Sequence, residues 1–108
     1  MPLTRKFKDT IRERAIQDTE YRESLLRESI NNLLIGDMLT GKSILRNYIN
    51  ATIGFKELGK FMHSSPKSLM RMLSPQGNPT AANLFGMIQV LAEKEGVVFD
   101  VTMSPSMS

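Results

Sequence analysis

The sequence predicts an all-α fold that ends in one short β-strand. Apolar residues recur at helical spacing along most of the chain, capping residues precede the apolar runs, and the stretch VVFDV alternates with a period of two. At 108 residues the chain can bury one modest core. With no Trp and 8 Met, much of that core must consist of Leu, Ile and Met.

Two helices are predicted before Gly36, which favours a helix stop because glycine tolerates a left-handed backbone. The first covers residues 4–16. Its narrow apolar stripe consists of Phe7, Ile11 and Ala15. The second begins after Asp18, whose carboxylate can accept a hydrogen bond from the helix start, and Glu20 complements the dipole there. Its apolar face consists of Tyr21, Leu25, Leu26, Ile30, Leu33 and Leu34.

A third helix is predicted between Asp37, another capping residue, and Gly54, another glycine stop. Its apolar residues are Met38, Ile44, Leu45, Tyr48, Ile49 and Ile53. The stretch KELGKFMHSSPKSLMRML, residues 56–73, then predicts a short helix, a polar break and a second short helix. Ser65 can cap this second helix, and Pro66 suits its first position because no hydrogen bond is lost there.

The stretch SPQGNPT, residues 74–80, predicts a loop because of its two prolines, its glycine and its asparagine. Thr80 can cap a last helix, Ala81–Glu95, with Gly96 after it. The side chains expected to face inward are Leu84, Phe85, Ile88 and Leu91. The acids expected to be solvated at the end of this helix are Glu93 and Glu95.

The stretch VVFDV predicts a short strand with Val97, Phe99 and Val101 on one face. A single strand leaves its backbone hydrogen-bonding groups without partners. The simplest partner is the same strand of a second copy, in antiparallel two-fold pairing. We therefore expect a homodimer in which these three residues lie at the subunit contact.

The composition excludes several kinds of site. Without Cys, neither a disulfide framework nor a thiolate metal site can form. No apolar run approaches the length of a membrane span, and the start MPLTRKFKDT lacks the apolar middle of a secretion signal, so we expect a cytoplasmic protein. No catalytic grouping or metal-ligand spacing occurs, and the single histidine, His63, is expected to be a turn residue. We expect no enzyme activity, cofactor or metal.

Basic residues concentrate in one part of the chain. Residues 54–82 contain four basic side chains and one acid, whereas residues 93–108 contain three acids and one basic side chain. The four basic residues are Lys56, Lys60, Lys67 and Arg71. This placement suits a surface that binds a polyanion, although an ordinary solvated face would give the same count.

Residues 56–73 have the spacing of two helices that cross closely. Gly59 supplies a small residue at the crossing, with Leu58 and Met62 beside it. The inner face of the second helix would consist of Leu69, Met72 and Leu73. If these side chains are buried, the face that points outward consists of Lys67, Ser68 and Arg71.

This outward face is basic and hydroxyl-bearing, and it occupies the half of the helix that reaches base edges in the major groove of DNA. Arg71 could bind guanine through two hydrogen bonds, and Lys67 and Ser68 could reach bases or phosphates. The residues expected to hold phosphate are Lys56, Lys60, Gln76 and Asn78.

These residues also resemble a known family. Residues 37–95 are similar to the Xre-type helix-turn-helix domain, which has a lambda-repressor-like fold. Within that group, SLMRMLSPQGNPTAANLF and the preceding YINATIGFKEL resemble the HigA-like addiction-module antidote proteins, the antitoxins of toxin–antitoxin operons. The resemblance implies a dimeric DNA-binding protein that represses its own operon and neutralises a ribonuclease toxin of the RelE/ParE-like fold. Residues 1–36 resemble these proteins only loosely.

By position, the resemblance implies base contacts from Lys67, Ser68 and Arg71. It implies phosphate contacts from Ser65, Lys56 and Asn78. The chain departs from the family pattern at two places. Phe55 stands where many such domains have a phosphate-binding Gln, so that contact is absent. The turn has His63 where Gly is common, so we expect His63 to adopt a positive φ.

We accordingly divide the chain into an N-terminal helical segment (1–36), a helix-turn-helix DNA-binding domain (37–96) and a C-terminal strand with a frayed tail (97–108). The N-terminal segment is either a pair of helices with a solvated outer face or a docking site for the toxin. RelE-like toxins are basic, so acidic side chains would make the contacts. The candidates are Glu13, Glu20, Glu23 and Glu28.

The sequence leaves two other functions open. One is a stand-alone Xre-type transcriptional regulator without a toxin, and the other is a helical protein-interaction module that binds no nucleic acid. A neighbouring gene for a small basic toxin would separate the antitoxin from the stand-alone regulator. Binding to promoter DNA would exclude the interaction module.

Overall fold

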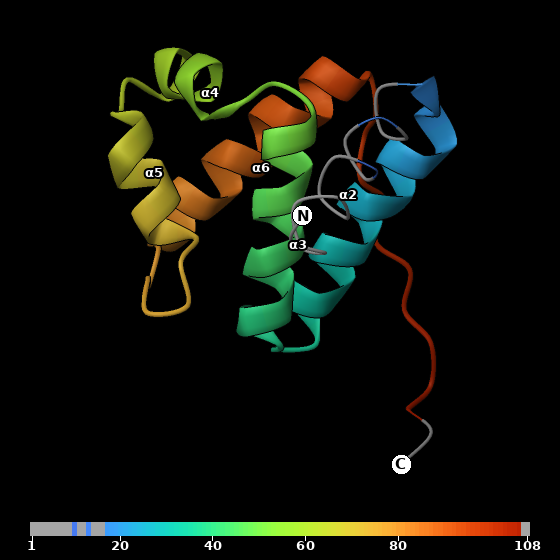
Figure 1. Cartoon of the computed structure of the whole chain (residues 1–108). Coiled ribbons are helices and arrows are strands. Elements are labelled where there is room, and N and C mark those ends of the chain that lie inside the picture. The colour runs from blue at the N-terminus through green and yellow to red at the C-terminus, as the bar shows by residue number, and fades with distance from the viewer. Residues whose placement is uncertain (1–9, 11–12, 14–16, 107–108) are drawn as a thin grey trace.

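A computed structural model describes residues 10, 13 and 17–106 of the chain, and over these residues the fold is all-α (Figure 1). Its helices are α2 (Thr19–Leu34), α3 (Met38–Ala51), α4 (Phe55–Met62), α5 (Pro66–Met72) and α6 (Ala81–Glu95). The apolar stripe predicted for the first helix, Phe7, Ile11 and Ala15, lies outside the described residues. None of the helices in the described part of the chain combines the length and the apolar character needed to cross a membrane.

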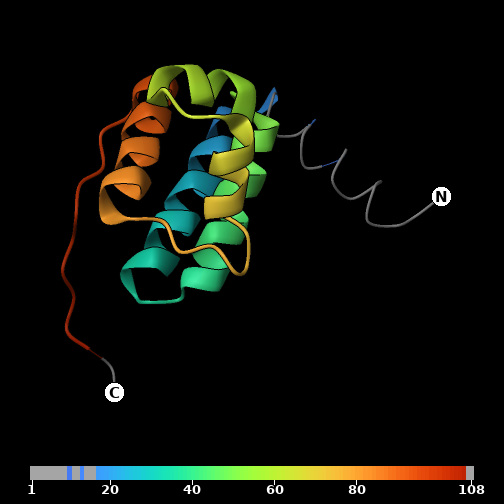
Figure 2. The same ribbon diagram turned by 90° about the vertical axis from the view of Figure 1, so that its left-hand side faces the viewer.

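The helices pack around one core. α2 and α3 form an antiparallel pair, α6 packs beside them, and α5 lies on the side of the molecule away from α2 (Figures 1 and 2). Every one of these helices contributes to the buried cluster, which consists of Leu26, Leu45, Tyr48, Ile49, Phe55, Leu58, Leu69, Leu73, Leu84, Met87, Ile88 and Leu91. Because Leu26 belongs to this cluster, α2 shares its core with the helices that follow it.

The helix boundaries follow the predicted capping residues. The side chains of Asp18, Asp37 and Thr80 each accept a hydrogen bond of 3.1 Å from the backbone N–H three residues further on. Gly36 and Gly96 follow α2 and α6 with positive φ values of 89° and 74°. These local signals therefore place the starts of α2, α3 and α6 correctly.

Two predicted core side chains are exposed. Phe85 is 63% exposed and Leu34 is 62% exposed, so both predictions are wrong. The core-facing stripe of α6 is already filled by side chains at helical spacing, namely Leu84, Met87, Ile88 and Leu91. Phe85 lies one residue around the helix from that stripe and faces away from it. Leu34 is the last residue of α2 and borders the turn to α3.

Glu95, which was expected to be solvated, is instead held in an ion pair. Its side chain is 5% exposed. The guanidinium of Arg22 donates to both carboxylate oxygens, through Nε at 3.0 and 3.1 Å and through Nη2 at 3.0 Å. The hydroxyl of Tyr48 donates to Oε1 at 2.5 Å. These three residues join α2, α3 and α6, a connection that no local sequence pattern indicates.

The same network shifts two pKa values in the protein interior. Burial by itself raises the pKa of Glu95, but the hydrogen bonds from Arg22 and Tyr48 and the charge of Arg22 outweigh it, so this pKa lies below its usual value. Burial, followed by the hydrogen bond to Glu95, raises the pKa of Tyr48 well above its usual value. The folded chain therefore keeps Glu95 charged and Tyr48 neutral over a wide pH range.

The predicted strand at residues 97–101 is not observed in the single chain. Residues 97–106 have no regular secondary structure. The segment runs beside α2, and together they line a groove of about 630 Å³. The residues predicted to form the strand face, Val97, Phe99 and Val101, all line this groove. A strand needs hydrogen-bonding partners, and the backbone of residues 98–102 has none within the described chain.

Candidate nucleic-acid interface

α4 presents two lysines on its outer face. Phe55, the first residue of α4, is 6% exposed and belongs to the core, which explains why an apolar side chain stands there. Lys56 and Lys60 are exposed. The ammonium of Lys60 lies 3.5 Å from the carboxylate of Glu57, but both side chains are more than half exposed, so the attraction is weak. Lys56 has no such partner among the described residues.

The turn from α4 to α5 depends on two residues. His63 ends α4 in the left-handed conformation with φ of 53°, as expected from the sequence. The backbone N–H groups of His63 and Ser64 both donate to the carbonyl of Gly59. A Cβ atom on Gly59 would lie 2.5 Å from the carbonyl oxygen of Ser64, so glycine is required at this crossing. α5 therefore begins in direct contact with α4.

The start of α5 is fixed by Ser65. Its hydroxyl oxygen accepts a hydrogen bond from the backbone N–H of Ser68 at 3.1 Å, and its hydroxyl group donates to the hydroxyl of Ser68 at 2.9 Å. Pro66 occupies the first helical position. Ser65 is thus used for capping, whereas the hydroxyl hydrogen of Ser68 is available to a ligand.

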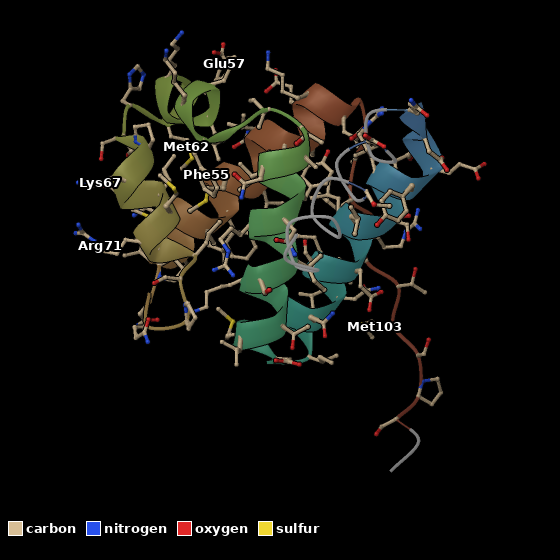
Figure 3. The ribbon with its side chains drawn as sticks, viewed as in Figure 1. Phe55, Glu57, Met62, Lys67, Arg71 and Met103 are labelled. Carbon is tan, nitrogen blue, oxygen red and sulfur yellow. The ribbon has the colours of Figure 1, made fainter. Side chains whose placement is uncertain are left out.

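Lys67 and Arg71 point away from the body of the molecule (Figure 3). They are four residues apart on α5, on the face opposite Leu69 and Leu73, which are fully buried. Met72 packs partly against the core. No carboxylate in the described part of the chain lies within ion-pair distance of Lys67 or Arg71. α5 therefore exposes two positive charges that no acid neutralises.

The loop after α5 forms a second polar region together with Arg71 of α5. Gln76 and Asn78 are exposed and line a hollow of about 450 Å³ together with Ser68 and Arg71. The loop folds back so closely that a Cβ atom on Gly77 would collide with the carbonyls of Arg71 and Met72. The structure therefore brings Ser68, Arg71, Gln76 and Asn78 together. Lys56 and Lys60 line a different hollow, beside His63.

Two basic residues of α3 hold this loop, a role that was not predicted from the sequence. Lys42 is 5% exposed, and its ammonium donates to the carbonyl oxygens of Ser74, Pro75 and Gly77 at 3.0, 3.4 and 2.6 Å. Arg46, one turn further along, donates from Nη1 to the carbonyl oxygen of Leu73 at 2.9 Å. One feature of the sequence could have indicated this role for Lys42 and Arg46. α3 contains two basic residues at helical spacing and no acid.

Three of the acids proposed as toxin contacts lie on α2. Glu20 and Glu28 are exposed, whereas Glu23 is half-buried and lines the groove beside the C-terminal segment. Glu23 and Glu28 are five residues apart, which places them on different faces of α2. Because α2 lies away from α5, these three acids are separate from the basic residues of α5 (Figure 1). Glu13, which precedes α2, is exposed.

A cluster of exposed apolar side chains surrounds the turn between α2 and α3. It consists of Leu34, Ile35, Met38 and Leu39, which are 62%, 79%, 39% and 60% exposed. Leu34 also lines the groove beside the C-terminal segment, so the two apolar surfaces are continuous. Contiguous exposed apolar side chains are typical of protein contact surfaces.

Comparison with known proteins yields no relatives: no protein-family model, curated protein or solved structure matches the chain. Among the residues that the structure describes, no group of three or more His, Cys, Asp or Glu side chains could hold a metal ion.

Proposed function

We propose that α4, the turn at residues 63–65 and α5 form a helix-turn-helix motif that binds double-stranded DNA. The supporting observation is that Lys67 and Arg71 extend from α5, opposite the buried Leu69 and Leu73, with no acidic partner among the described residues. A recognition helix enters the major groove with its N-terminal part. In this position Arg71 offers two parallel hydrogen bonds to guanine, and Lys67 and the hydroxyl of Ser68 reach neighbouring bases.

The phosphate contacts in this proposal come from both sides of α5. Lys56 and Lys60 project from α4, and Gln76 and Asn78 project from the loop that follows α5. Contacts of this kind position a protein on the duplex without reading its sequence, and they make binding weaken as salt concentration rises.

We further propose that the DNA is the operator of the chain's own operon, and that the chain acts in the cytoplasm as a homodimeric antitoxin against a RelE/ParE-like toxin. The support is the resemblance of residues 37–95 to HigA-like antidote proteins. The apolar cluster at the α2–α3 turn supports a protein partner. For the homodimer, the support is the segment at residues 98–102, whose backbone groups make no hydrogen bond within the described chain.

A gel-shift experiment with the full chain tests DNA binding. Arg71→Ala should weaken binding to the operator by about 1–3 kcal/mol, because the hydrogen bonds to guanine are lost. Lys56→Ala should weaken binding to operator and unrelated duplexes alike, because it removes a phosphate contact. Lys94→Ala, on α6, is the control and should leave binding unchanged. A wild-type chain that binds no duplex at low salt would refute the proposal.

A second candidate function is a helical protein-interaction module, which the exposed apolar cluster of Leu34, Ile35, Met38 and Leu39 favours. Failure of the wild-type chain to bind DNA, together with binding of a partner that Ile35→Lys abolishes, would support this function. Between the antitoxin and a stand-alone regulator, the deciding observation is whether a gene for a small basic toxin lies beside this one.

A further inference from the structure

Lys42 is a buried positive charge that no negative charge compensates. Its side chain is 5% exposed, and no carboxylate in the described part of the chain lies within ion-pair distance. Asp37, the nearest acid in the sequence, is exposed and caps the start of α3. Removing a charge from water is costly unless the charge is both paired and hydrogen-bonded, and Lys42 has hydrogen-bond acceptors but no paired charge among the described residues. Core stability alone therefore does not account for a lysine here.

The partners of Lys42 indicate what the charge does. Its ammonium has three donors, and these meet the carbonyl oxygens of Ser74, Pro75 and Gly77. Three carbonyl groups of the loop backbone are thus tied to α3, and Arg46 ties the preceding carbonyl, that of Leu73, in the same way. The loop from residue 73 to residue 77 is held over its whole length by side chains of one helix.

The same arrangement favours a negative ligand on the outer side of the loop. The carbonyl oxygens of Ser74, Pro75 and Gly77 accept hydrogen bonds from Lys42. The backbone N–H groups of Gln76 and Asn78, in contrast, make no hydrogen bond within the described residues. A chain segment with unused N–H groups and a positive charge behind it attracts anions. Arg71 contributes a further positive charge to the hollow that this loop forms with α5.

We propose that Lys42 is a positioning residue for a DNA phosphate: it fixes residues 74–78 in the shape that receives the phosphate oxygens, and it places an uncompensated positive charge beneath them. The inference rests on the proposed DNA binding, and it assigns a role to a residue that cannot itself touch the duplex because it is buried. The ligand class is a phosphodiester of the DNA backbone, so the contribution of Lys42 does not depend on base sequence.

Hydrogen exchange without DNA tests the positioning role. In wild type, the backbone N–H of Gly77 donates to the carbonyl of Ser74, which Lys42 also holds. Lys42→Met keeps the length of the side chain but removes its charge and its donors. The amides of Ser74 and Gly77 should exchange about tenfold faster in this variant, as expected when a local opening becomes about 1.4 kcal/mol easier. Lys94→Met removes the same charge from exposed α6 and should leave these amides unchanged. Equal exchange in all three proteins would overturn the positioning role.

Binding to a duplex of mixed sequence tests the phosphate role. Lys42→Met should bind about tenfold more weakly than wild type and Lys94→Met at low salt, at a temperature at which all three proteins are folded. A lower melting temperature with unchanged DNA affinity would assign Lys42 to stability alone and overturn the proposal. If wild type binds no DNA, the phosphate role fails with the proposed function, whereas the exchange experiment still decides whether Lys42 holds the loop.

Discussion

His63 shows how one residue determines the geometry of the candidate interface. It is the only non-glycine residue with a positive φ in the described chain, and it makes the turn that brings α5 against α4. The left-handed conformation costs an L-residue roughly 1–2 kcal/mol, part of which glycine avoids. The chain therefore carries strain at the point where the proposed DNA-binding helix is oriented.

This strain can be measured. His63→Gly should stabilise the protein by about 0.5 kcal/mol, because the relief of the backbone exceeds the extra chain entropy that glycine loses on folding. Urea denaturation gives the free energy of unfolding. The matched control is Gln89→Gly in the exposed part of α6, which should destabilise the protein by about 0.5–1 kcal/mol. Equal destabilisation in both variants would contradict the interpretation of His63.

A second residue-level prediction concerns Glu95 and acid. Because the fold lowers the pKa of Glu95 below its ordinary value of 4.5, the unfolded chain binds more protons than the folded chain as the pH falls. The stabilisation is therefore complete above pH 4.5 and is lost as the pH falls through the lower, folded pKa. Glu95→Gln should remove this dependence and should cost about 1–3 kcal/mol at neutral pH, since Arg22 and Tyr48 lose their charged acceptor.

Urea denaturation at several pH values measures this effect. Glu93→Gln is the matched control, because Glu93 is exposed two residues earlier on the same helix. It should retain the loss of stability in acid that wild type shows. If Glu93→Gln and Glu95→Gln respond to pH in the same way, the ion pair with Arg22 does not contribute the predicted stability.

At the scale of helices, local chemistry made the boundaries predictable. Asp18, Asp37, Thr80, Gly36 and Gly96 act on the backbone within a few residues, so their effect can be inferred from the sequence. The prediction that Gly54 ends α3 is wrong, because α3 ends at Ala51 and Gly54 precedes the first residue of α4. Side-chain surroundings depend on distant partners. Glu95 could not be assigned without knowing that α2 brings Arg22 to it, and Lys42 could not be assigned without the path of the loop after α5.

The outward face of α5 was predictable because it depends on helical geometry and not on distant partners. Its inner face is fixed by Leu69 and Leu73, so the positions of Lys67 and Arg71 follow from helical geometry alone. The C-terminal strand was predicted from alternation, but alternation does not supply a hydrogen-bonding partner, and the single chain has none for residues 98–102.

The crossing of α4 and α5 gives a prediction for a whole element. Gly59→Ala should destabilise the protein by about 2 kcal/mol, because the new methyl group would lie 2.5 Å from a backbone oxygen that cannot move without shifting α5. Thermal unfolding measures the change. Gly86→Ala is the control: its methyl group meets only the flexible end of Met62, at 3.3 Å, and alanine favours a helix. It should be neutral or stabilising, and equal losses in the two variants would contradict the close crossing.

On the scale of the whole molecule, charge and apolar surface are segregated. Lys67 and Arg71 lie on α5, whereas the groove between α2 and residues 97–102 lies on the side of the molecule away from α5 (Figure 1). DNA and a protein partner could therefore bind at the same time, as the proposed repressor and antitoxin would require.

The proposed homodimer is tested at this scale. If residues 97–101 pair with the same segment of a second copy, the wild-type chain should sediment as a dimer at micromolar concentration, and Phe99→Glu should shift it to monomer by placing a charge at the contact. Val98→Glu is the control, because Val98 is 92% exposed and would lie on the other face if the strand formed. A wild-type chain that sediments as a monomer would refute the proposal.

The bond between Arg22 and Glu95 also has a consequence for how the protein is made. The two residues are 73 positions apart, so a ribosome adds the carboxylate 73 residues after the guanidinium. The nascent chain can pair α2 with α3 as soon as both have emerged, but it cannot join α2 to α6 before residue 95 has been added. α6 therefore completes the structure around a helix pair that can form before it.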